Sequence, residues 1–129
     1  MESIVSVSLF VLAAICNAVM DISSHHFSES ALRSFNPMWW NAEVSWKNKY
    51  VDGDPKLGRR KIWRKINYPV QLTDAWHFFK TLMIVLLALS VLSFSGEITG
   101  YFIVDLLIYG FAWNLPFNLF YNRILRRPG

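Results

Sequence analysis

Three long apolar stretches constrain this chain more than any other feature of its sequence. Residues 4–22 (IVSVSLFVLAAICNAVMDI) would rise about 28 Å as a helix, close to the ~30 Å hydrocarbon core of a bilayer. TLMIVLLALSVLSF (81–94) reaches spanning length if its helix starts near Asp74, and residues 98–120 are long enough on their own. Backbone polar groups in lipid need internal partners, so we expect a helix in each stretch.

Composition supports the same class. Of the 129 residues, 53% are hydrophobic and 16% aromatic, with a mean hydropathy of +0.27, well above an ordinary soluble domain. We therefore predict an all-α integral membrane protein with three transmembrane helices and a single domain, 1–129. Its expected parts are helices at about 3–26, 73–94 and 98–122, a long basic, aromatic-rich loop at 27–70, and a basic tail at 123–129.

A cleaved signal peptide is the main alternative for the first stretch. The starting residues MES lack the positive charge that such peptides carry, and the LAAIC sequence fits a lipoprotein cleavage site poorly. We therefore expect a retained helix. The chain has one cysteine, Cys16, so no disulfide forms within it and cysteine usage says nothing about compartment.

Basic residues are distributed on one side of the predicted spans. Three of them follow the third span, Lys80 lies early in the second, and the short connection SGEITG holds none. Positive charge marks cytoplasmic segments, so we predict an outside N-terminus, with the loop and the C-terminus in the cytoplasm. Nine of the 13 Lys and Arg lie between the first two spans: Arg33, Lys47, Lys49, Lys56, Arg59, Arg60, Lys61, Arg64 and Lys65.

Aromatic residues alternate with the basic residues of this loop. Tryptophan and tyrosine prefer the headgroup region, and each nearby Lys or Arg adds about 1 kcal/mol at an anionic leaflet. We expect the loop to lie on the inner membrane surface. The alternative is that its basic residues only set the topology of the chain. Nothing further points to nucleic acid, which a similar pattern can bind. The candidate lipid-surface residues are Trp39, Trp40, Trp46, Lys47, Lys49, Arg59, Arg60, Lys61, Trp63, Arg64 and Lys65.

Polar residues recur at helical spacing in all three spans. The predicted topology brings these faces to one depth near the inner leaflet, where they are more easily buried against each other than against lipid. Lys80, one turn after His77, is a candidate to hold an anionic group. The three faces are Asn17, Asp21 and His25 in the first span, Asp74, His77 and Thr81 in the second, and Asn114, Asn118 and Asn122 in the third.

Two carboxylates and two imidazoles in this region suggest a metal centre. Asp21, His25, Asp74 and His77 are suitable ligands for a divalent transition metal such as zinc, which would activate water against a lipid headgroup. Without metal, an Asp–His pair is a general base with an orienting carboxylate. The structural alternatives are that Asp74 caps its helix, that the histidines mark the membrane exit, and that the asparagines join helices.

Two further residues of the third span stand apart. Asp105 lies nearer the outer side and is expected to face another helix or subunit, because the sequence offers it no evident partner. Pro116 is expected to kink the helix and free a carbonyl at the depth of the polar faces.

The segments SWKNKY (45–50) and TDAWHFFK (73–80) resemble those of small uncharacterised inner-membrane proteins of bacteria. The resemblance covers about half of the chain. It implies a bacterial inner-membrane setting and supplies no activity.

Three function classes follow from the sequence. The first is a subunit or scaffold of a membrane assembly, a homo- or hetero-oligomer, that contacts anionic lipid at the cytoplasmic leaflet. The second is a membrane-embedded, metal-dependent enzyme acting on lipid headgroups through the Asp/His cluster. The third is a component of an oligomeric transporter or channel, since three helices cannot enclose a path.

Overall fold

The computed structural model describes residues 1–94 and 96–127 and is mostly helical. Its long helices are α1 (Glu2–His25), α4 (Ala75–Leu92) and α5 (Phe102–Leu119). Counting α5 together with the helical segment that continues it to Leu125, all three are long and apolar enough to cross a membrane. The predicted helical class with three candidate spans is therefore confirmed. Ser95 and the last two positions of the predicted tail, 128–129, lie outside the described residues.

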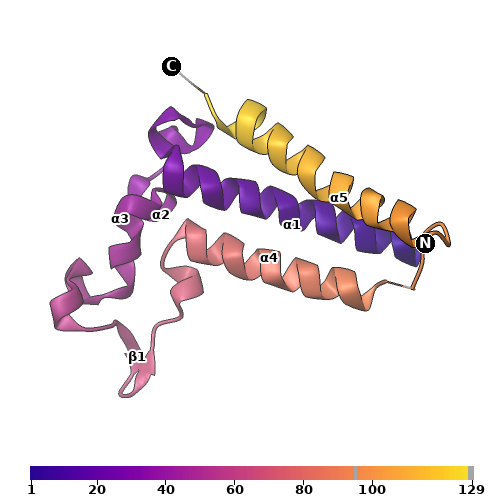
Figure 1. Ribbon diagram of the computed structural model, residues 1–129. Helices are drawn as coiled ribbons and strands as arrows, with labels where there is room; N and C mark the ends of the chain where they lie inside the picture. Colours follow the sequence, from indigo (N-terminus) through magenta and orange to yellow (C-terminus); the bar gives the residue numbers. More distant parts are fainter. Residues whose placement is uncertain (95, 128–129) are drawn as a thin grey trace.

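The helix α1 lies between α4 and α5 and packs against both (Figure 1). Its buried positions are mostly small, among them Ala13, Ala14, Cys16 and Ala18, and small side chains let helix backbones approach closely. In an apolar 18-residue stretch of each candidate span, 33% of α1 is buried, against 11% of α4 and 0% of the span Phe102–Leu125. The core therefore follows α1, and the outward faces of α4 and α5 remain exposed.

The bundle has two distinct ends. At the N-terminal end lie Met1, the last turn of α4 and the first turn of α5 (Figure 1). At the loop end lie the last turn of α1, the first turn of α4 and η7 (Phe120–Leu125), a π-helical segment that continues α5. The helix passes through Pro116, whose missing N–H leaves the Ala112 carbonyl without its usual helical donor.

The start of α5 differs from the expected position near residue 98. Residues 98–101 instead form a turn that Asp105 holds. The carboxylate of Asp105 accepts hydrogen bonds from the backbone N–H groups of Ile98 (3.0 Å) and Thr99 (2.9 Å), and from the Thr99 hydroxyl (2.6 Å). The expectation that Asp105 lacks a partner in this chain is therefore wrong, because its partners lie in the turn just before its own helix.

The long loop is built from short elements beside the loop end of the bundle. Two of these elements begin with an Asn or Asp that precedes a proline: the side chains of Asn36 and Asp54 each accept a backbone N–H two residues later. The elements are η1 (Phe27–Glu29), η2 (Ala31–Ser34), α2 (Pro37–Trp40), α3 (Ala42–Ser45), η3 (Trp46–Lys49), η4 (Val51–Gly53), η5 (Pro55–Leu57), β1 (Lys61–Trp63), β2 (Ile66–Asn67) and η6 (Val70–Leu72).

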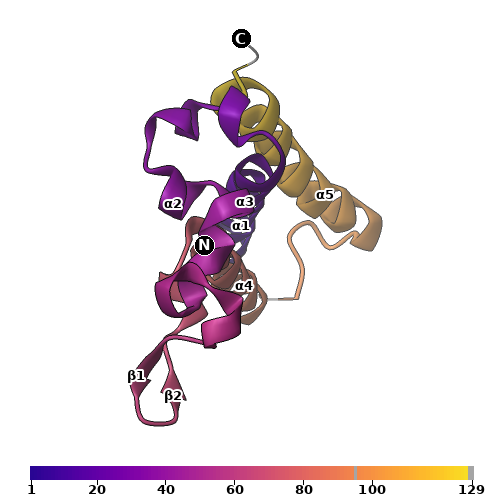
Figure 2. The same ribbon diagram turned by 90° about the vertical axis from the view of Figure 1, so that its left-hand side faces the viewer.

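The strands β1 and β2 form an antiparallel hairpin, with Trp63 opposite Ile66 and the dipeptide Arg64-Lys65 at the turn. Figures 1 and 2 show that the hairpin projects sideways from the loop end, away from the helices. The first part of the loop, in contrast, packs on the bundle. Val19, Ile22, Leu32 and Leu125 form a buried cluster there, surrounded by Phe27, Trp40, Phe79, Phe120 and Tyr121.

Candidate functional site

Asp74 is the most deeply buried ionisable side chain at the loop end, with 1% of its surface exposed. It caps α4 by accepting the backbone N–H of His77 at 2.9 Å, and its other oxygen accepts the Thr73 hydroxyl at 3.0 Å. The Nδ1 atom of His77 lies 2.9 and 2.8 Å from the two carboxylate oxygens. The i, i+3 spacing at a helix start produces both contacts. The helix-cap interpretation of Asp74 is therefore confirmed.

This pairing determines what His77 can do. When the carboxylate is ionised it only accepts hydrogen bonds, and the proton that joins the two side chains is then on Nδ1. In the neutral ring, Nε2 is then left as an acceptor. Within residues 1–94 and 96–127, Nε2 has no hydrogen-bond partner. The arrangement is that of a general base held in place by a carboxylate.

A small cavity of about 110 Å³ adjoins the pair. At about 30 Å³ per water molecule, it accommodates a few waters or one small polar group, and is too small for a whole lipid headgroup. At 4.8 Å from the ring centroid of Trp76, the Lys80 ammonium makes a cation–π contact. The cavity is lined by Ser24, Ala42, Trp46, Asp74, Trp76 and His77.

The other half of the predicted metal centre does not join this pair. Asp21 is half-buried and His25 is exposed, and neither side chain makes a hydrogen bond or ion pair with any described residue. No group of three or more His, Cys, Asp or Glu side chains in the described part of the chain could hold a metal ion. The four-residue centre predicted from Asp21, His25, Asp74 and His77 is therefore not assembled. Within each pair the expected helical spacing is present, four residues in the first pair and three in the second.

The predicted supporting polar face is also divided. The side chain of half-buried Asn17 has no hydrogen-bond partner among the described residues, and the Thr81 hydroxyl donates to the His77 carbonyl at 3.0 Å. The three asparagines of α5 and η7 are exposed instead of buried against the other helices. Their amides bond along their own helix. The prediction that the three asparagines share one helical face is confirmed. The prediction that this face is buried against the other helices is wrong.

The predicted lipid-surface residues divide between the packed part of the loop and the hairpin. Trp39 and Trp40 are half-buried, and their rings make tilted contacts with Phe78 and Phe79 of α4, respectively. The Lys47 and Lys49 ammonium groups lie 5.7 and 5.4 Å from the ring centroids of Trp46 and Tyr50. The exposed members without such packing lie on or beside the hairpin: Arg59, Lys61, Trp63, Arg64 and Lys65.

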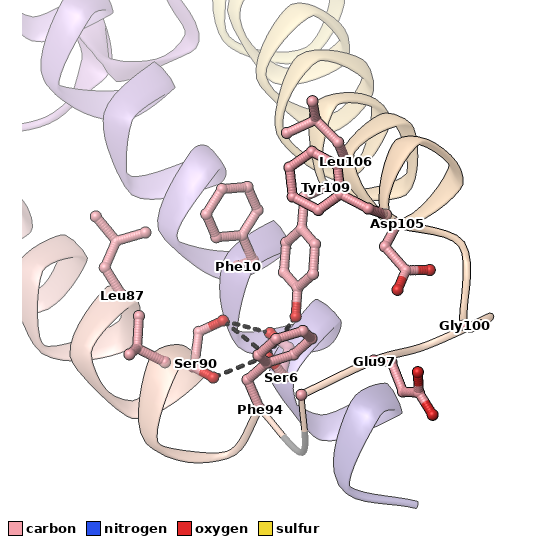
Figure 3. A pocket seen from close by; sticks show the side chains of 13 residues that line it. Ser6, Phe10, Leu87, Ser90, Phe94, Glu97, Gly100, Asp105, Leu106 and Tyr109 are labelled. Carbon is pink, nitrogen blue, oxygen red and sulfur yellow. Dashed lines mark hydrogen bonds between the residues drawn. The ribbon is translucent and has the colours of Figure 1, made fainter.

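A larger cavity, of about 580 Å³, lies at the N-terminal end between α1, α4, α5 and the turn before α5. Figure 3 shows that Ser6, Ser90 and Tyr109 meet on one side of it. The Ser6 hydroxyl lies 2.6 Å from the Tyr109 hydroxyl and donates to the Ser90 carbonyl at 2.8 Å. Phe10, Leu87, Phe94 and Leu106 form apolar walls. Since these hydroxyl groups already bond to each other, the cavity suits an apolar occupant.

Sequence reasoning missed this cluster of two serines and a tyrosine. The available signal was the presence of Ser6 and Ser90 inside apolar runs, near the predicted outer ends of their helices. Polar side chains in such positions bond across helices. The pairing itself depends on α1 lying beside α4, which no local pattern gives.

Comparisons with protein-family models, with curated proteins and with solved structures find no match for this chain.

Proposed function

We propose that this chain is a small polytopic protein of the bacterial inner membrane that serves as a subunit or scaffold of a membrane assembly. Its N-terminus faces outward, while its loop and C-terminus are cytoplasmic. The loop anchors to anionic lipid at the cytoplasmic leaflet. The three candidate spans and the clustering of nine of 13 basic residues between two of them support this orientation.

The position of the β1–β2 hairpin is the observation that carries the proposal. If the helices stand across a bilayer, a hairpin that leaves the loop end sideways runs along the membrane surface (Figures 1 and 2). Its apolar side chains are open: Ile62 is 58%, Trp63 68% and Ile66 62% exposed. Arg64 and Lys65 lie at its turn. Exposed tryptophan and isoleucine beside basic residues favour the headgroup region of an anionic leaflet.

The lipid contact can be tested with the full-length protein in lipid nanodiscs. A spin label at Asn67→Cys, in a Cys16→Ala background, reports the depth of the hairpin through its accessibility to oxygen and to a water-soluble nickel chelate. We expect a label at headgroup depth in discs that contain phosphatidylglycerol, and release into water at high salt, which screens the attraction. Equal aqueous exposure in phosphatidylglycerol and in phosphatidylcholine discs would contradict the anchor.

A charge-matched pair of variants separates the hairpin from the loop as a whole. Arg64→Gln with Lys65→Gln should weaken the lipid contact by about 2 kcal/mol, at about 1 kcal/mol per charge. Arg33→Gln with Lys56→Gln removes the same charge from exposed positions elsewhere in the loop and should have a smaller effect. If both pairs release the hairpin equally, the charge of the loop acts without any contribution from hairpin geometry.

The Asp74–His77 pair favours a second candidate, an enzyme that acts on lipid headgroups with His77 as general base. The supporting observation is that His77, paired with Asp74, lines a cavity at the proposed inner leaflet that accommodates a few water molecules, which a general base can activate. Purified protein incubated with mixed bacterial phospholipids should then release headgroup products that mass spectrometry detects, and His77→Gln should abolish the release. Unaltered lipids with the native protein would reject this candidate.

A further inference from the structure

An exposed polar stripe runs along α5 and into η7. It consists of Gly110, Asn114, Asn118 and Asn122, spaced four residues apart, and we call it the asparagine stripe. All four residues are exposed, and the flanking Phe111 and Leu115 are 59% and 64% exposed. The stripe therefore lies on the face of α5 that is turned away from α1.

The amides of the stripe bond to their own helix in sequence. Asn114 donates to the Gly110 carbonyl at 2.9 Å, Asn118 to the Asn114 carbonyl at 2.8 Å, and Asn122 to the Asn118 side-chain oxygen at 3.2 Å. Each amide has two N–H donors, so at each position one N–H is left without a partner among the described residues. The side-chain oxygen of Asn114 has no donor among the described residues.

These spare groups lie at membrane depth if α5 crosses the bilayer. Asn114 is twelve residues from the start of the span at Phe102, or about 18 Å at 1.5 Å per residue, which is near the middle. Lipid chains offer no hydrogen bonds, so an amide that faces them keeps its unmet donors and acceptors at a cost. A partner with matching amides removes that cost.

We propose that the asparagine stripe is the contact face for α5 of a second copy of this chain. Two copies inserted in the same orientation are related by an axis along the membrane normal, so equivalent residues meet at equal depth. Asn114, Asn118 and Asn122 then face their own counterparts. An amide both donates and accepts, which makes this stripe complementary to itself, as an asparagine in a parallel helical dimer is.

Gly110 contributes a second, independent feature. A Cβ added at this position would meet nothing within 4 Å, so the backbone surface is open there. A glycine one turn before a polar side chain lets two membrane helices approach closely enough for interhelical hydrogen bonds. The inference rests on the proposed membrane insertion and subunit role, and it identifies the partner and the contact face.

Disulfide crosslinking in native membranes tests the contact directly. Asn118→Cys in a Cys16→Ala background should form a covalent dimer on mild oxidation, because a disulfide requires Cβ atoms within about 4.5 Å. Leu82→Cys on α4 is the matched control. It is also exposed and also lies about 10 Å from the loop end of its helix, and it should give little dimer.

Three results would overturn the inference. One is equal crosslinking at Asn118 and Leu82, which indicates random collision. Another is no crosslinking at Asn118. The third is a product whose mass is not twice the 15.0 kDa of the chain, which indicates a different protein as the partner.

Energy transfer between labelled copies in vesicles gives an equilibrium measurement. Replacing Asn114, Asn118 and Asn122 by leucine should weaken association roughly tenfold or more, given the usual strength of interhelical hydrogen bonds in membranes. Gly110→Leu should weaken it too, by separating the helices, without disturbing one copy. Alanine at Leu82, Val85 and Leu89 of α4 should change association by no more than about twofold. Unchanged association in both α5 variants would contradict the proposal.

The nanodisc experiment separates failure of this inference from failure of the proposed function. It reads the depth of the hairpin in discs that contain one copy, and so does not depend on α5 contacts. If the hairpin enters the anionic leaflet and Asn118→Cys gives no dimer, only the second-copy contact is wrong. If the dimer forms and the hairpin stays in water, only the lipid anchor is wrong.

Discussion

The side chains of Ser6 and Ser90 join α1 to α4 through a reciprocal pair of hydrogen bonds. The Ser6 hydroxyl donates to the Ser90 carbonyl, and the Ser90 hydroxyl donates to the Ser6 carbonyl, both at 2.8 Å. Both side chains are buried. Because the Tyr109 hydroxyl also lies 2.6 Å from that of Ser6, this single serine connects all three long helices (Figure 3).

Ser6→Ala should therefore destabilise the bundle more than other serine changes in α1. It removes the bonds that the Ser6 hydroxyl makes to the Ser90 carbonyl and to the Tyr109 hydroxyl, while the bond from the Ser90 hydroxyl to the backbone carbonyl of residue 6 remains. We expect a loss of about 1–2 kcal/mol in free energy of unfolding. Tyr109→Phe removes one of these bonds and should cost less than about 1 kcal/mol. Unfolding by denaturing detergent in mixed micelles measures both.

Ser8→Ala is the matched control for this prediction. Ser8 lies on the same helix and is exposed, and its hydroxyl forms no hydrogen bond within the described residues, so its loss should change stability by less than about 0.5 kcal/mol. Equal losses of stability in Ser6→Ala and Ser8→Ala would show that the contact between Ser6 and Ser90 does not stabilise the bundle.

The pair formed by Asp74 and His77 shows what the sequence could predict. Both the helix cap and the i, i+3 contact are local, and local spacing is visible in a sequence. The prediction that Asp21 and His25 join this pair concerns tertiary structure. It depended on which faces of α1 and α4 meet, and the structure buries small residues of α1 at those faces instead.

Asp105 and the asparagines show why other parts of the site could not be predicted. The partners of Asp105 include backbone N–H groups, which nearly every residue carries, so no side-chain pattern reveals them. The spacing of Asn114, Asn118 and Asn122 correctly placed them on one face. Where that face points depends on how α5 rests on α1, and periodicity does not contain that information.

Removing the carboxylate of Asp105 should loosen the turn before α5. Asp105→Ala leaves the N–H groups of Ile98 and Thr99 and the Thr99 hydroxyl without their acceptor, so the melting temperature in detergent should fall. Hydrogen exchange at the two N–H groups should become faster, which mass spectrometry of the intact protein followed by peptide analysis detects. Glu97→Gln, just before this turn, should leave both measurements near those of the native chain.

Loss of the Asp74 side chain should be costly because it both caps α4 and holds His77. We expect Asp74→Ala to lower the free energy of unfolding by about 1–2 kcal/mol, and Asp74→Asn, which still caps, to cost less. Asp54→Ala removes the cap of a three-residue turn in the exposed loop and should fall within about 0.5 kcal/mol of the native value. If Asp54→Ala lowers the free energy of unfolding as much as Asp74→Ala does, capping of α4 contributes no more to stability than capping of the loop turn.

The orientation of the chain can be read with reporters that are active on only one side of the membrane. Inserted at Gly96, between α4 and α5, a reporter should indicate the outside, and fused after the last residue it should indicate the cytoplasm. The reason is that the connection near Gly96 holds no Lys or Arg, while Arg123, Arg126 and Arg127 follow the third span. Replacing these three arginines with glutamine should leave the orientation unchanged, because the nine basic residues of the loop still mark the cytoplasmic side. The same compartment at both positions would mean that α5 does not cross the membrane, and the proposed depth of the asparagine stripe would be wrong with it.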